Sequence, residues 1–162
     1  MVVMDQYSRR IIGFAVQPIA LHGPAICRMF CEIMKGGGLP KRLSLDNDPL
    51  FQFHQWEANL RILELKTVTS VPYIPVSHPF VERLIGTIRR EFLDHTFYWN
   101  ETDLLRKLNQ FKDYYNATRV HQGIEGKTPK LVADKLEPNV GDLNCYRWKS
   151  HCNGLFEMPE AA

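Results

Sequence analysis

One segment constrains the fold more than any other, because its apolar residues recur at the spacing of an α-helix. The segment is SHPFVERLIGTIRREFLD, residues Ser77 to Asp94. Its apolar stripe consists of Val81, Leu84, Ile85, Ile88 and Phe92. Such a stripe is stable only when it is buried, so we expect this helix to pack on a sheet and to expose its opposite face.

The exposed face of this helix begins with a carboxylate. Glu82 lies off the apolar stripe, and Gly86 and Arg89 follow it four and seven residues later. Residues at these intervals lie along one line of a helix. A carboxylate, a position without a side chain and a guanidinium therefore share a line that suits a negatively charged backbone. An ordinary solvated helix face has the same composition, so both interpretations stay open here.

A second carboxylate ends a run that is typical of a β-strand. In KRLSLDNDPLF, residues Lys41 to Phe51, apolar and polar residues alternate up to Asp46, and a turn follows. Between Asp46 and Glu82 lie 35 residues. Carboxylates are the ligands that Mg²⁺ prefers in proteins, so the two residues are candidate metal ligands. We expect Asp48, also in this turn, to be a turn or cap residue.

Four segments, in this order, extend the pattern over most of the chain: MDQYSRRIIGFAV from Met4 to Val16, LDNDPLF from Leu45 to Phe51, the helix segment that carries Glu82, and YYNATRVHQGIEGKTP from Tyr114 to Pro129. Together they resemble the catalytic core of the retroviral-integrase superfamily, whose acidic triad is Asp, Asp, 35 residues, Glu. They look most similar to bacterial insertion-sequence transposases.

This resemblance implies an α/β, RNase H-like fold, in which helices flank a mixed sheet. It implies catalytic and metal-binding roles for Asp46 and Glu82, which would hold two Mg²⁺ or Mn²⁺ ions ~4 Å apart. The implied activity is metal-dependent DNA cleavage and strand transfer in DNA integration or transposition. Contacts to DNA are expected from Tyr73, His78, Arg83, Arg89, Arg90, Arg119 and Lys127.

The first aspartate of the family's triad has no counterpart in this sequence. Asp5 is the nearest candidate, but MDQYSR matches the strand that follows the family's first strand, so we leave Asp5 out of the site. We therefore expect the first, central strand to be lacking, Met1 to be an internal methionine of a longer transposase, and this chain to be incomplete and inactive. The alternative is a non-catalytic remnant that binds DNA, or that associates with a full-length transposase and inhibits it.

The remaining elements follow from local patterns. We expect the catalytic core to extend over residues 1–135 and a tail with a short strand or hairpin over 136–162. The predicted elements are a hairpin of Met1 to Tyr7 with Ile11 to Val16, helices at Leu21 to Lys35, Gln52 to Asn59 and Asn100 to Ala117, and strands at Arg42 to Asp46 and Arg61 to Val71.

Composition excludes some classes of protein. The chain has 162 residues, 44% hydrophobic and 23% charged, which is typical of a globular domain. A formal net charge of +2 is too small to argue for nucleic-acid binding, so that argument depends on the site. No apolar run reaches the ~20 residues of a membrane span, and we expect a cytoplasmic protein without membrane contact. We expect it to act on DNA, as a homo-oligomer or with a full-length transposase.

Overall fold

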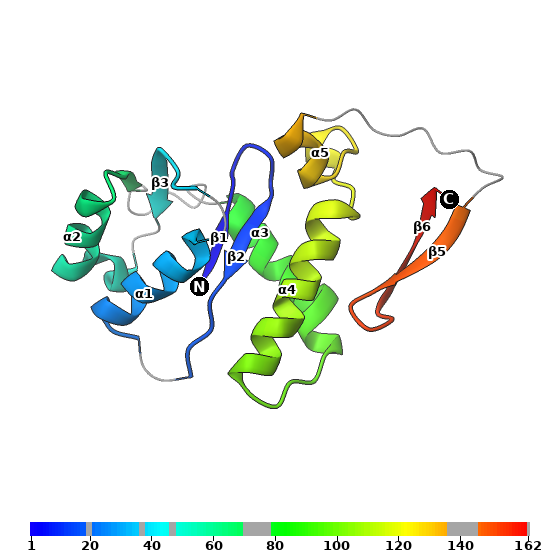
Figure 1. Ribbon diagram of the computed structural model, residues 1–162, viewed down its shortest axis with the longest axis horizontal. Helices are drawn as coiled ribbons and strands as arrows, with labels where there is room; N and C mark the ends of the chain where they lie inside the picture. The colour runs from blue at the N-terminus through cyan, green and yellow to red at the C-terminus, as the bar shows by residue number, and fades with distance from the viewer. Residues whose placement is uncertain (19–20, 36–37, 46–47, 70–78, 136–145, 162) are drawn as a thin grey trace. The chain divides into compact units, whose positions relative to one another are not determined.

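The computed structural model covers residues 1–162 and describes all of them except 19–20, 36–37, 46–47, 70–78, 136–145 and 162 (Figure 1). The chain forms two compact units. Unit 1 comprises Met1–Val3 and Ile12–Arg89, and unit 2 comprises Met4–Ile11 and Arg90–Ala162. Each unit is described by itself below.

The core of unit 1 is built on two helices, α1 (Gly23–Met34) and α2 (His54–Ile62). The α1 helix begins where the ring of His22 accepts a hydrogen bond from the amide of Ala25 at 3.3 Å. Phe30 of α1 meets Trp56 of α2 edge to face, with 5.3 Å between ring centroids, and both side chains are about 1% exposed. A short 3₁₀ turn, Pro49–Gln52, precedes α2.

Two pairs of strands cover this core. The hairpin strands β1 (Val2–Met4) and β2 (Ile11–Phe14) form one pair, and the parallel strands β3 (Arg42–Leu45) and β4 (Lys66–Thr69) form the other. Both pairs pack on the same helices, through Met1, Val3, Ile12, Ala15, Leu43 and Leu45. No described strand joins the two pairs into one sheet.

Gly13 shows how closely β2 approaches α1. A Cβ atom at this position would lie 2.9 Å from Cγ2 of Ile33, which is closer than carbon atoms pack. The strand therefore needs a residue without a side chain at this point.

The core of unit 2 is built on α4 (Glu101–Ala117), which is capped by Asn100 as predicted. The Asn100 side chain accepts a hydrogen bond from the amide of Asp103 at 2.9 Å. The side chain of Phe111 is fully buried and packs against Phe92, with 5.0 Å between ring centroids. Helix α5 (Pro129–Asp134) follows, and the hydroxyl of Thr128 caps it by accepting from the amide of Leu131.

The C-terminal segment, where a short strand or a hairpin was expected, contains the antiparallel strands β5 (Tyr146–His151) and β6 (Phe156–Ala161). Phe156 stacks on Tyr114 of α4, with 4.2 Å between centroids and 3° between ring planes. In Figure 1 the hairpin lies beside α4. None of the helices among the described residues is both long and apolar enough to cross a membrane.

Candidate active site

The segment that carries Glu82 forms α3 (Pro79–Thr87), which continues as a π-helical turn, Ile88–Phe92, and a 3₁₀ turn, Leu93–His95. Leu84, Ile88 and Phe92 are buried as predicted, with exposures of 2%, 6% and 1%. Ile85 was expected in this stripe but is 46% exposed, and Thr87 is buried instead. The buried arc is centred on Leu84 and its i+3 and i+4 neighbours, so Ile85 falls at its edge.

Glu82 lies in the first turn of α3 and is exposed. It forms no hydrogen bond or ion pair with a residue that the structure describes. An exposed carboxylate is the kind of ligand that a hard divalent cation prefers.

The strand that leads toward Asp46 was predicted to extend from Arg42 to Asp46, and the structure describes it from Arg42 to Leu45. In β3 the side chains of Leu43 and Leu45 pack on the core of unit 1, while Arg42 and Ser44 are exposed. Asp46 follows directly, but it lies outside the described residues, as do Tyr73 and His78.

Two other carboxylates that the sequence analysis considered, Asp48 and Asp5, have structural partners. Asp48 accepts a hydrogen bond from the amide of Leu50 at 2.9 Å and so caps the 3₁₀ turn, as predicted. Asp5 accepts bonds from the amides of Tyr7 and Ser8 and from the Ser8 hydroxyl. These bonds hold the tight turn between β1 and β2, which is a reason beyond sequence matching for leaving Asp5 out of the site.

The donor chemistry of Asp46 and Glu82 fits a hard divalent cation, because both offer carboxylate oxygens. Within the described ranges, however, no group of three or more His, Cys, Asp or Glu side chains is placed to hold a metal ion.

The arginines proposed to contact DNA fall into two kinds. Arg83, Arg89 and Arg90 are exposed, and none of them pairs with a carboxylate in the described part of the chain. Arg89 and Arg90 lie in the π-helical turn, a feature that is rare and often found at functional sites. Their guanidinium groups are available for charge-assisted bonds to phosphate.

Arg119, by contrast, is engaged within unit 2. It donates two hydrogen bonds to the carboxylate of Glu91, at 2.7 and 3.1 Å, and its guanidinium lies 5.6 Å from the ring centroid of Tyr115. Its Nη1 atom is also 3.3 Å from Nδ1 of His121. Burial, followed by the positive charge of Arg119, lowers the pKa of His121 to about 4. This cluster ties the end of the Glu82 segment to the segment after α4.

The other polar residues of the C-terminal motif also have structural roles. The Asn116 side chain accepts from the amide of Ile11 at 2.8 Å and donates to its carbonyl at 2.9 Å. Lys127 lies 3.5 Å from the carboxylate of Glu125, and its side chain is 37% exposed. Sequence reasoning missed the roles of Glu91 and Asn116, because both partners are distant along the chain.

Comparison with known proteins agrees with this fold. The family model described as integrase core domain matches residues 63–129. This range contains Glu82 and every predicted DNA-contacting residue, and it does not contain Asp46. None of the curated proteins matches the sequence.

Several solved structures are similar. One is a chain of the simian T-cell lymphotropic virus intasome in complex with PP2A regulatory subunit B56 gamma, with a TM-score of 0.67, 19% identity, and coverage of 94% of this chain and 56% of that one. The BIV integrase catalytic core domain has a TM-score of 0.61 and 20% sequence identity, and the match covers 83% of this chain and 84% of that one. The HTLV-2 integrase catalytic core domain in complex with magnesium, in a dimeric form, has a TM-score of 0.60 and 20% sequence identity, and the match covers 81% of each chain.

The fold is therefore the α/β, RNase H-like fold of integrase catalytic cores, as predicted. The resemblance to an integrase or transposase catalytic core is confirmed, and residues 63–129 match the integrase core domain. The chain spans 56% of the intasome chain and more than four fifths of each isolated core domain.

Proposed function

We propose that this chain is part of a DNA-processing core that cleaves and joins phosphodiester bonds in DNA integration or transposition. The observation that supports this most directly is the exposed carboxylate of Glu82 at the start of α3, inside the range that matches the integrase core domain; it has no partner among the residues that the structure describes. The opposite face of α3 is buried, so the position of Glu82 is fixed by packing.

In this proposal Asp46 and Glu82 would hold divalent cations, Mg²⁺ or Mn²⁺. When bound, a pair of such ions supplies a more acidic attacking hydroxyl and a stabilised leaving oxygen. The exposed Arg83, Arg89 and Arg90 bind DNA phosphates by charge-assisted hydrogen bonds and so align the backbone along α3. Within unit 2, Lys127 is a separate candidate for a phosphate contact, while Arg119 is held in an ion pair with Glu91.

We propose further that a strand carrying an aspartate completes this core between β1 and β3. The two strand pairs pack on one set of helices without a ladder between them, and a two-stranded parallel pair is rarely stable alone. An added strand would satisfy the edge donors and acceptors and bring a third carboxylate toward Asp46.

The second candidate function is a non-catalytic DNA-binding protein, or a partner that inhibits a full-length transposase. The observation that favours it is the exposure of Arg83, Arg89 and Arg90, because arginines can bind DNA phosphates without a metal ion. The two functions differ in their dependence on an added strand.

The test is to supply an aspartate-bearing strand ahead of Met1 and to measure nicking and strand transfer on a labelled DNA duplex with Mg²⁺ or Mn²⁺. We expect activity to appear and to fall by orders of magnitude in Asp46→Asn and in Glu82→Gln. Asp94→Asn, which changes an exposed carboxylate at the far end of the same segment, serves as the control and should remain active. Full activity in Glu82→Gln would exclude the proposed site.

A further inference from the structure

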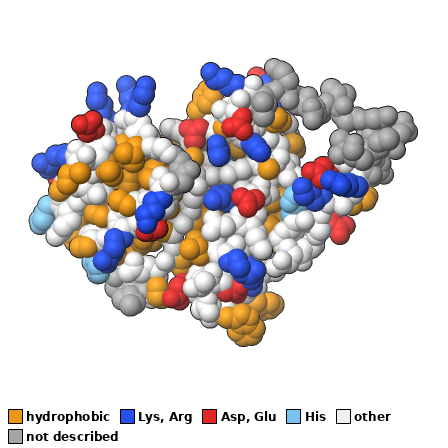
Figure 2. Space-filling view, in the orientation of Figure 1, with side chains coloured by type: hydrophobic (Ala, Val, Ile, Leu, Met, Phe, Trp, Pro, Cys, Tyr) orange, Lys and Arg blue, Asp and Glu red, His pale blue; other side chains and the backbone are white. Residues whose placement is uncertain are grey.

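An exposed aromatic loop precedes α4 and has no role in the site described above. Phe97, Tyr98 and Trp99 are 89%, 51% and 90% exposed. Among the residues that the structure describes, Phe97 and Trp99 are the most exposed of the large hydrophobic side chains. A hydrophobic cluster projects at the lower edge of Figure 2, where Figure 1 places the loop before α4. Exposed apolar clusters of this kind mark interaction surfaces.

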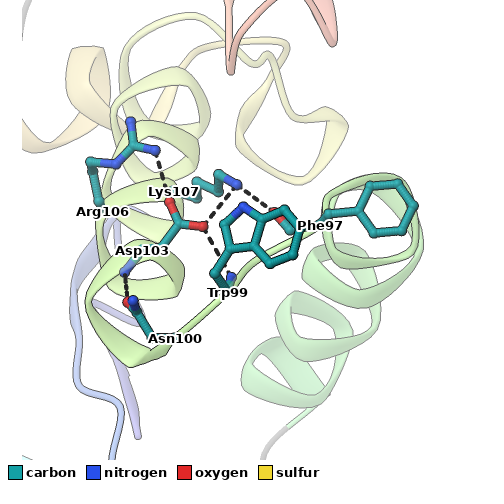
Figure 3. Close-up of polar contacts among 6 residues, drawn as sticks. All are labelled: Phe97, Trp99, Asn100, Asp103, Arg106 and Lys107. Carbon is teal, nitrogen blue, oxygen red and sulfur yellow. Dashed lines mark hydrogen bonds and ion pairs between the residues drawn. The ribbon is translucent and has the colours of Figure 1, made fainter.

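Hydrogen bonds fix the backbone of this aromatic loop. Figure 3 shows the Asp103 carboxylate at the centre of the network, where it accepts from the amide of Trp99 at 3.3 Å and pairs with Lys107 at 3.0 Å. The Lys107 ammonium also donates to the carbonyl of Phe97. The side chains of Asp103 and Lys107 are only 15% and 14% exposed, so this ion pair lies beneath the loop.

Two further contacts complete the network. Arg106 donates to Asp103 at 2.8 Å, and Asn100 caps α4 through the amide of the same residue. Hydrogen bonds from Arg106 and Lys107 lower the pKa of Asp103 to about 2. The aromatic rings are therefore presented on an ordered backbone, which reduces the entropy lost when a partner binds.

The charges around the aromatic loop are mixed. Asp94 and Glu101 are exposed, and the positive charges of Arg106 and Lys107 are shared with Asp103. Such a surface does not attract a polyanion, so it is poorly suited to a DNA backbone. It is compatible with a second protein surface of the same composition, because groups of both signs can face each other.

We infer that the aromatic loop is a contact surface between two copies of this chain. Aromatic side chains bury ~150–250 Å² each. The almost fully exposed Phe97 and Trp99 and the half-exposed Tyr98 therefore offer roughly 350–600 Å² per copy. A twofold contact would then bury roughly 700–1,200 Å² from these rings alone, a range that includes the lower limit of ~1,000 Å² for a specific interface. A symmetric contact needs only this one surface on each copy.

The test is sedimentation velocity of the full chain over a range of concentrations, without DNA or metal ions, so that its outcome is independent of the proposed function. We expect a concentration-dependent dimer. Phe97→Ala and Trp99→Ala should each raise the dimer Kd at least about tenfold, because central aromatic residues carry most of the energy of such interfaces. Ile62→Ala, which removes a hydrophobic side chain that is 80% exposed in unit 1, is the matched control and should not change the Kd.

A second variant separates the order of the loop from its rings. Lys107→Met keeps the apolar stem and both rings but removes the bonds to Phe97 and Asp103, so the Kd should rise about three- to tenfold while the helical circular dichroism is retained. A chain that is monomeric at all concentrations, or a dimer that persists when both rings are replaced by alanine, would overturn the inference. So would a double variant that associates normally but loses DNA affinity, because the rings would then stack on bases.

Discussion

The stability of the protein should respond differently to the same substitution at the two glutamates of the Glu82 segment. Glu91 is held by two hydrogen bonds from Arg119, at 2.7 and 3.1 Å, and the two side chains are 36% and 26% exposed. Glu82 is exposed and unpaired in the described structure. Glu91→Gln should therefore destabilise the protein, whereas Glu82→Gln should change its stability little.

The expected magnitude follows from the burial of the pair. Fully exposed ion pairs contribute ~0.2–1 kcal/mol, and breaking fully buried ones costs ~3–5 kcal/mol. The Glu91–Arg119 pair is partly exposed, and Gln retains one acceptor oxygen, so we expect a loss of ~1–2 kcal/mol in the free energy of unfolding. Glu82→Gln should change it by less than ~0.5 kcal/mol.

The assay is urea unfolding followed by circular dichroism. With a slope of ~2 kcal/mol/M, Glu91→Gln should lower the midpoint by ~0.5–1 M, and Glu82→Gln should leave it in place. A double-mutant cycle with Arg119→Gln should give a coupling of ~1 kcal/mol. Unchanged stability in Glu91→Gln, together with zero coupling, would refute the structural role of this pair. If Glu91→Gln were instead the inactive variant of the completed core, Glu91 would replace Glu82 as the metal ligand.

Three further predictions concern the chain as it stands. Without an added strand it should neither nick nor join DNA with Mg²⁺ or Mn²⁺; robust turnover that depends on Asp46 would contradict this. DNA affinity, measured by fluorescence anisotropy, should fall steeply with salt and should weaken in an Arg89→Ala, Arg90→Ala variant; a salt-independent affinity would remove the proposed DNA surface. The pKa of His121 is lowered from 6.5 to about 4, mainly by burial, so its contribution to stability is complete above pH 6.5 and is lost as the pH falls toward 4. After allowance for solvent screening we expect this loss to be ~1 kcal/mol in acid unfolding curves, and His121→Gln should abolish it.

Local patterns were sufficient to predict most of the secondary structure. The hairpin of β1 and β2, the strand that ends before Asp46, and the C-terminal hairpin all occur where turn residues and alternation indicate them. The start of α4 at Asn100 was predicted because a cap residue bonds to an amide only three residues away. These features depend on neighbouring residues, so the sequence carries them directly.

The predicted boundaries of helices and strands were less accurate where no cap or turn residue marks them. Residues Gln52 to Asn59 were expected to form a single short helix, but a 3₁₀ turn ends at Gln52 and α2 extends from His54 to Ile62. The following strand accordingly begins at Lys66, later than the predicted Arg61. The π-helical turn after Thr87 was not predicted, because a 3.6-residue period cannot show where a helix widens.

The features of the candidate site also fall into two groups, those predicted from the sequence and those that depend on the tertiary structure. The sequence determined the candidate ligands Asp46 and Glu82 and the exposed arginines of the Glu82 segment, since spacing and helical period are properties of the chain itself. Only the tertiary structure decided that Arg119 pairs with Glu91, 28 residues away, and that Asn116 binds the backbone of Ile11, 105 residues away. An arginine or an asparagine is the same residue in the sequence whether its side chain contacts DNA or another segment of the chain. Its partner depends on how distant segments pack, and that packing is set by the burial of Phe92 and Phe111 rather than by any local signal.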